Sequence, residues 1–177
     1  FHSLFIQAAY CVFCFSRRGV LVLPLRGSLG VSLALGRLGS ARRLCLTELF
    51  AKIEQAVLEG GLFAMAMPRG SGKTSLCETA CLWAMLYGHR GFVALIGSDE
   101  EHAADMLDSI KAELENSELL AADFPEVCHP IRSLEGITQR AAGQLYRGRQ
   151  THIGWTAKEI VLPTIEGSEA SGAIIRV

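Results

Sequence analysis

The sequence predicts an α/β fold in which a parallel sheet is flanked by helices, and three observations predict it. From residue 47 onward, short apolar segments of strand type alternate with longer segments of helical periodicity. The intervals between the apolar segments are long enough for crossover helices, which favour parallel strands with right-handed connections. A glycine-rich turn at residues 68–74 also separates the first strand from the helix that follows it.

The chain divides near residue 47 into two parts of different composition. Residues 1–46 contain six arginines, no acidic residue and no steady periodicity, whereas residues 47–177 contain 11 basic and 18 acidic residues. We expect residues 1–46 to be an atypical extension, either disordered or translated from upstream sequence, with a weak membrane-surface segment as the alternative. Its apolar run, residues 4–15, is shorter than the roughly 20 residues that span a bilayer. The net charge of residues 47–177 does not by itself predict nucleic-acid binding.

The first predicted helix begins at Thr47, a residue type that caps helices, and ends at Gly60 and Gly61. The next apolar run, residues 62–67, is expected to be a buried strand. A second helix is predicted from about Ser75 to Tyr87, followed by a buried strand at residues 92–96. The apolar face of the first helix is formed by Leu49, Phe50, Ile53, Ala56 and Val57.

The third predicted helix runs from Asp99 to about Glu115, with one apolar face. The residues expected to point inward are Ala103, Met106, Leu107, Ile110 and Leu114. Ser98 and Glu101 have the spacing of a capping box, which satisfies the first amides of a helix. An acidic pair after an apolar strand also resembles a magnesium site, but Gly97 and Ser98 separate the strand from Asp99, so capping is favoured.

The segment after Asn116 has a weaker pattern. We expect a short helix at residues 117–122, a turn at 123–126 and a helix at 131–146 loosened by its glycines. Short strands are predicted at residues 151–155, 159–162 and 173–177. The last of these reads as a strand with no closing element, so we expect an incomplete sheet.

The glycine-rich turn has the composition of a phosphate-binding loop, the Walker A motif of P-loop NTPases. Glycines let successive backbone amides point inward as an anion-binding nest at the start of a helix. A lysine next to the loop reaches the β and γ phosphates, and the following hydroxyl ligates Mg²⁺. The predicted ATP-binding residues are Pro68, Arg69, Gly70, Ser71, Gly72, Lys73, Thr74 and Ser75, with Lys73 as a catalytic residue and Thr74 as the metal ligand.

One position departs from the usual motif. Met67 stands where the pattern has its first glycine. Pro68 can turn the chain without that glycine, because its φ angle is already fixed. Arg69 lies inside the loop, where its guanidinium could stabilise charge on the γ phosphate as a second catalytic residue, or remain solvated. The alternative for the whole loop is a chance glycine-rich turn.

Residues 64–74, with Pro-Arg-Gly before Gly-Lys-Thr, resemble the nucleotide loops of phage terminase large subunits. Weaker similarity follows at residues 83–88, 97–101, 123–126 and 160–168. The resemblance covers about residues 47–177, and only the similarity at the nucleotide loop is specific. It implies a RecA-like (ASCE) P-loop ATPase domain that drives viral DNA into capsids.

The resemblance implies ATP and Mg²⁺ as ligands. It also implies double-stranded viral DNA, a portal protein and a small terminase subunit as partners, a homo-oligomeric ring and a location in the host cytoplasm without a membrane. We find no convincing Walker B strand or nuclease domain, so we expect weak nucleotide binding without sustained hydrolysis. The alternatives are a helicase-like translocase, a small-molecule kinase and a non-catalytic nucleotide-binding fragment.

Other residue types give weaker indications. The six cysteines do not have the spacing of a metal site, since Cys11 and Cys14 are not followed by a second cysteine pair at a suitable distance. We interpret the cysteines as buried free thiols of a protein in a reducing compartment. Gln55 could contact adenine, although a polar position on an amphipathic helix is the simpler interpretation. Three arginines could contact DNA or a neighbouring subunit or form a solvated face: Arg140, Arg147 and Arg149.

Overall fold

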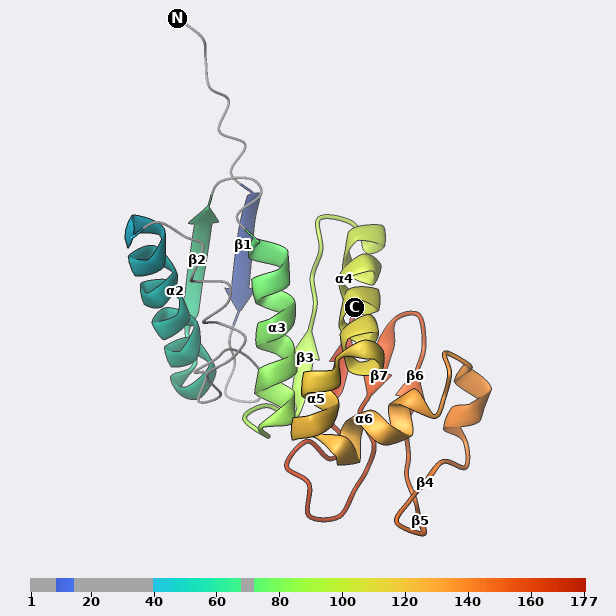
Figure 1. Ribbon diagram of the computed structural model, residues 1–177. Coiled ribbons are helices and arrows are strands. Elements are labelled where there is room, and N and C mark those ends of the chain that lie inside the picture. The colour runs from blue at the N-terminus through green and yellow to red at the C-terminus, as the bar shows by residue number, and fades with distance from the viewer. Residues whose placement is uncertain (1–8, 15–39, 68–71) are drawn as a thin grey trace, which may run out of the picture.

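The computed structural model describes residues 9–14, 40–67 and 72–177, which form a mixed α/β structure (Figure 1). In chain order the helices are α2 (Ser40–Glu59), α3 (Lys73–Leu86), α4 (Glu100–Asn116), α5 (Glu118–Asp123), α6 (Pro125–Arg132) and the 3₁₀ turn η1 (Thr138–Ala141). The strands are β1 (Ala9–Cys14), β2 (Leu62–Met67), β3 (Phe92–Ala94), β4 (Leu145–Tyr146), β5 (Arg149–Gln150), β6 (Gly154–Trp155), β7 (Glu159–Val161) and β8 (Ile174–Arg176).

The strands form three sheets within the described residues. β1 pairs antiparallel with β2, from Ala9 opposite Met67 to Cys14 opposite Leu62. The largest sheet has the order β3-β8-β7-β6, and β4 forms a separate hairpin with β5. In the largest sheet only β3 and β8 are parallel. β6, β7 and β8 follow one another without a crossover helix and therefore run antiparallel. β2 and β3 are not paired with each other in this part of the chain, so the parallel P-loop sheet stays a prediction.

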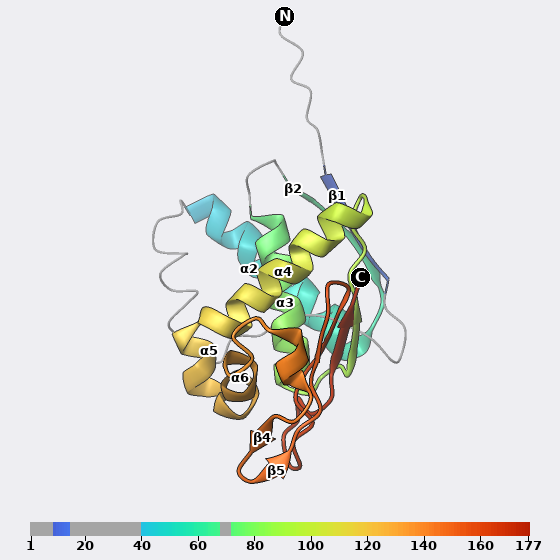
Figure 2. The same ribbon diagram turned by 90° about the vertical axis from the view of Figure 1, so that its right-hand side faces the viewer.

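Helices α3 and α4 lie on the same side of the strands and supply much of the core (Figure 2). The inward residues predicted for α4 are confirmed, because Leu107, Ile110 and Leu114 are fully buried and Ala103 and Met106 nearly so. Burying one such leucine or isoleucine side chain contributes roughly 2 kcal/mol. The apolar face of α2 is also confirmed at Leu49, Ile53, Ala56 and Val57, with Phe50 half-buried. Buried residues of α2, α3 and α4 thus belong to one hydrophobic cluster.

Several predicted boundaries differ from the structure. Helix α2 begins at Ser40, so Thr47 lies inside it rather than at its N-cap, and the helix crosses the compositional boundary at residue 47. The strand at Phe92 is not buried on both faces, since Phe92 is 41% exposed and Ile96 is 86% exposed. The exposure alternates along the segment, since Val93 and Leu95 are buried in the core while Phe92 and Ile96 face away from it.

The predicted helix at residues 131–146 is also wrong. Helix α6 ends at Arg132, and Glu135 and Gly136 both adopt left-handed backbone angles, with φ of 50° and 71°. Two successive residues of this kind cannot continue a right-handed helix. The expected turn at residues 123–126 shrinks to Phe124, because Pro125 starts α6 at a position that proline favours. The short helix before it and the strands near residues 154, 160 and 175 are confirmed.

Candidate functional site

The predicted phosphate-binding loop falls partly within the described structure. Residues 68–71, which include Arg69 and Gly70, lie outside the described residues. Gly72, Lys73, Thr74 and Ser75 are described, and they follow one another at the start of α3. β2 ends at Met67, so the predicted loop connects this strand to this helix. That order is the one in which a phosphate-binding loop occurs.

Gly72 is the N-cap of α3. Its backbone is left-handed, with φ of 78° and ψ of 22°, and no side-chain hydrogen bond caps the helix there. The first hydrogen bond of the helix runs from the Leu76 amide to the Gly72 carbonyl oxygen, at 2.9 Å. The first amides of any helix have no acceptor within the helix. The N-terminus of α3 therefore presents backbone donors at the positive end of the helix dipole.

The side chains at this N-terminus differ in exposure. Lys73 is only 9% exposed, whereas Thr74 and Ser75 are exposed. Burial of a lysine requires compensating interactions, because a desolvated ammonium is costly. The Thr74 hydroxyl reaches solvent at the helix end and is able to ligate a cation. Amides, one ammonium and one hydroxyl are the donor set that a magnesium-bound polyphosphate requires.

A groove between α3 and α4 begins next to this site. Its volume is about 400 Å³, and its lining includes Ser75, Glu78 and Thr79 from α3 and Ser109 and Asn116 from α4. The Ser109 hydroxyl donates to the Glu78 carboxylate at 3.1 Å, which links the two helices. Burial raises the pKa of Glu78, and the Ser109 hydrogen bond partly opposes that shift. Sequence reasoning did not identify this pair, because its two members lie 31 residues apart.

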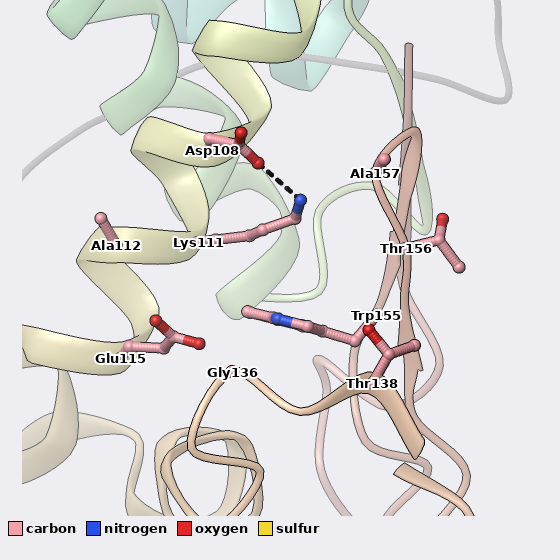
Figure 3. A pocket seen from close by; sticks show the side chains of 9 residues that line it. All are labelled: Asp108, Lys111, Ala112, Glu115, Gly136, Thr138, Trp155, Thr156 and Ala157. Atoms are coloured by element: carbon pink, nitrogen blue, oxygen red, sulfur yellow. Dashed lines mark hydrogen bonds and ion pairs between the residues drawn. The ribbon is translucent and has the colours of Figure 1, made fainter. Parts of the chain in front are cut away.

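A second hollow, of about 350 Å³, lies between α4 and the β6–β7 turn (Figure 3). Lys111 and Asp108 form an ion pair of 2.6 Å on its α4 side. The Trp155 side chain extends toward α4 from the strand side and is 5% exposed. None of the predicted nucleotide-binding residues lines this hollow. It is therefore a separate feature from the N-terminus of α3.

The acidic residues after β3 serve helix α4. The Asp99 carboxylate caps the helix by accepting from the His102 amide at 2.8 Å, and the Ser98 hydroxyl donates to it at 3.0 Å. Capping is thus confirmed for this segment, but the cap is Asp99 rather than the predicted Ser98. The Asp99 backbone is extended, with φ of −149°, which suits an N-cap residue. Glu100 forms an ion pair with Lys158.

These contacts change the acidity of both carboxyl groups. The hydrogen bonds from the His102 amide and from Ser98 lower the pKa of Asp99, and Lys158 lowers the pKa of Glu100. Within the described part of the chain, no group of three or more His, Cys, Asp or Glu side chains is placed to hold a metal ion. Nor does any helix in that part have the length and apolar character needed to cross a membrane.

The remaining candidates have ordinary structural surroundings. Gln55 is exposed and donates to Glu59 at 2.9 Å on the same helix face. Cys81 and Cys128 are buried free thiols, as predicted, and Cys77 is also buried. Burial raises the pKa of Cys81 to about 12, so this thiol is unreactive at neutral pH. Arg140 pairs with Glu135, and Arg149 pairs with Glu166.

Comparisons with known proteins give no further assignment, since no family model, curated protein or solved structure matches the chain.

Proposed function

We propose that the chain binds ATP with Mg²⁺ at residues 68–75 and is the ATPase part of a DNA-packaging motor of the terminase large-subunit type. The observation that carries the proposal is the sequence Pro-Arg-Gly-Ser-Gly-Lys-Thr placed between β2 and α3. Gly72 at the start of α3 supports it, because a glycine N-cap has no side chain that could accept from the first amides of the helix. An anion is the natural occupant of such a helix end.

Each described residue has a distinct role in this proposal. The first amides of α3 donate to phosphate oxygens, and the Lys73 ammonium balances their charge. The exposed Thr74 hydroxyl is the proposed ligand of Mg²⁺, whose charge offsets that of the phosphates when it is bound. Arg69 is proposed to stabilise charge on the γ phosphate, and it lies outside the described residues.

We propose nucleotide binding rather than sustained turnover for this chain. Hydrolysis by a P-loop ATPase needs an acid that completes the magnesium site and another group that orients water. Asp99 is already used as the α4 cap, and Glu100 is paired with Lys158. Viral DNA, a portal protein, a small terminase subunit, a homo-oligomeric ring and a host-cytoplasm location are proposed from the resemblance of residues 64–74 alone.

The test is a titration with a fluorescent ATP analogue, with Mg²⁺ and with EDTA. Lys73→Ala should weaken binding at least about tenfold, because a charge-assisted hydrogen bond contributes roughly 1.5–3 kcal/mol. Thr74→Ala should remove most of the difference between Mg²⁺ and EDTA. Lys52→Ala and Thr79→Ala are matched controls, since Lys52 is an exposed lysine of α2 and Thr79 an exposed threonine of α3.

Both controls should bind the analogue as the wild-type chain does. Identical binding by wild type and Lys73→Ala would mean that the glycine-rich turn is only a structural connection. Continuous phosphate release by the isolated chain would contradict the part of the proposal that concerns turnover. Thermal unfolding of every variant separates lost binding from lost structure, which matters because Lys73 is buried.

A further inference from the structure

The β4–β5 hairpin projects from the end of the molecule where the largest sheet meets α6 (Figures 1 and 2). Leu145 pairs with Gln150 and Tyr146 with Arg149, so Arg147 and Gly148 form a two-residue turn. Leu145, Arg147, Gly148 and Arg149 are exposed. The hairpin is therefore an outward-facing ribbon with two arginines at its tip.

The base of the hairpin is fixed to the body of the protein. The Thr151 amide donates to the Gln144 carbonyl oxygen at 2.9 Å, and the Thr151 hydroxyl donates to the same oxygen at 3.2 Å. Thr151 is only 3% exposed, so this double contact is protected from water. The tip is consequently held in a defined position rather than at the end of a loose loop.

The hairpin lies in the longest stretch of residues 47–177 that contains no acidic residue. Residues 136–158 contain three arginines and one lysine, whereas the remainder of residues 47–177 contains seven basic and 18 acidic residues. A basic ribbon on an otherwise acidic domain gives the molecule a charge asymmetry. Such an asymmetry orients a protein toward a polyanion, even when its total charge is near zero.

Arg147 occupies a backbone conformation that arginine does not favour. Its φ angle is 50°, and the following Gly148 has a φ of 77°. Turns of this type prefer Asn, Asp or Gly, and a residue with a bulky side chain costs roughly 1–2 kcal/mol in the left-handed region. The Arg147 guanidinium lies 5.2 Å from the centre of the Tyr146 ring, which supports it while leaving its donors accessible. The charged Arg147 thus occupies a turn position at which Asn, Asp or Gly is preferred.

Arg149 is also accessible for a new partner. It pairs with Glu166, but the side chains are 76% and 78% exposed, and an ion pair of this kind contributes about 0–1 kcal/mol. A phosphate oxygen can replace such a carboxylate at little cost. Arg147 in the turn and Arg149 directly after it therefore both present exposed guanidinium groups at the tip of the hairpin.

We propose that the β4–β5 hairpin is a contact surface for duplex DNA, with Arg147 and Arg149 binding backbone phosphates. The major groove of a B-form duplex admits a two-stranded β-ribbon, and arginine forks match phosphate oxygens. The choice of DNA as the polyanion rests on the proposed function. The surface itself contains no residue of the nucleotide loop, so the two proposals can be tested separately.

The test uses the full chain and a short fluorescein-labelled DNA duplex, with anisotropy measured over a series of salt concentrations. The hairpin variant is Arg147→Asn with Arg149→Gln, because asparagine suits the left-handed turn position and should maintain or raise Tm. The charge-matched control is Lys52→Gln with Arg176→Gln, two exposed cations of α2 and β8. Loss of two phosphate contacts should weaken binding about tenfold or more at low salt and reduce the salt slope by roughly 2.

The control variant should bind the duplex as the wild-type chain does. The proposal is overturned if wild type fails to bind the duplex, if the hairpin variant binds normally, or if the control loses affinity equally. Lys73→Ala should keep full duplex affinity in the absence of nucleotide. If the wild-type chain does not bind the ATP analogue but binds the duplex through the hairpin, the proposed ATP site is wrong. The proposed DNA contact of the hairpin is then still supported.

Discussion

Helices α3 and α4 are neighbours of similar length whose N-termini are built in opposite ways. α4 begins at Asp99, whose own carboxylate accepts from the His102 amide and brings negative charge to the positive end of the helix. α3 begins at a left-handed glycine, with no side-chain cap. Both helices need acceptors for their first amides, and only α4 obtains one from a side chain of its own cap.

The contrast separates a structural helix end from one suited to a ligand. Glu100 and Glu101 add further negative charge to the first turn of α4, so this end would repel a polyphosphate. The first turn of α3 has no acidic residue and holds Lys73 and Thr74 instead. The acidic run before α4 and the glycine-rich run before α3 thus give the two helix N-termini different backbone conformations and different charges. The proposed nucleotide site depends on that difference.

The largest expected effect of a single change concerns the entry to α4. A Cβ atom at Gly97 would lie 2.7 Å from the Ala103 amide nitrogen and 2.8 Å from the Asp99 carbonyl oxygen. These are backbone atoms, which cannot move aside without disturbing the capped turn. We expect Gly97→Ala to lower the free energy of unfolding by about 2–3 kcal/mol, measured by urea denaturation. If Gly97→Ala lowers the free energy of unfolding by less than Gly72→Ala does, the backbone before α4 can rearrange to accept the added methyl group.

Gly72→Ala should have a smaller effect on stability and a larger one on binding. A Cβ atom at Gly72 would meet nothing within 4 Å among the described residues, so only the left-handed backbone is unfavourable. We expect a loss of about 1 kcal/mol in the free energy of unfolding. Binding of the fluorescent ATP analogue should fall several-fold, because a change of backbone angle redirects the first amides of α3. Gly97→Ala, assayed below its unfolding transition, should bind the analogue normally. Equal losses of analogue binding in the two variants would contradict the proposed difference between the N-termini of α3 and α4.

Sequence patterns predicted the helices and their inward faces because both depend on local spacing. The inward residues of α4 recur at helical intervals, and those of α2 do so from Leu49 to Val57. The same reasoning placed the start of α2 too late, since the residues before Thr47 lack a periodic apolar pattern. It also predicted a helix at residues 131–146, where the left-handed backbone of Glu135 is not evident from the residue type.

Long-range features could not be obtained in that way. The strand at residues 174–176 was predicted, but its position between β3 and β7 depends on pairing between distant segments. The nucleotide loop is a prediction from sequence alone, because the residues proposed to bind phosphate are consecutive in the chain. The sequence leaves open whether Arg147 and Arg149 contact DNA or a neighbouring subunit or form a solvated face, because their position on a hairpin anchored by Thr151 is a property of the folded chain. The Glu78–Ser109 contact is of the same kind.

The smallest expected effect tests the charge of the α4 cap. The pKa of Asp99 is lowered, chiefly by the His102 amide hydrogen bond, so the folded state favours the ionised carboxylate. A lowered folded pKa gives stability that is complete above the unfolded value, near 3.8, and is lost as pH falls through the lower folded value. Asp99→Asn keeps an acceptor at the N-cap but removes the charge.

We therefore expect Asp99→Asn to unfold a few degrees below wild type at pH 7 and pH 5, with the gap closing as pH falls below 4. Thermal unfolding followed by circular dichroism at pH 7, 5 and 3 measures this difference. Asp105→Asn, farther along α4, makes the same charge change without removing the cap and should show a smaller gap at pH 7. A gap for Asp99→Asn that persisted unchanged at pH 3 would mean that the carboxylate stabilises α4 by shape alone. The contrast with the cap-free end of α3 would then not be electrostatic.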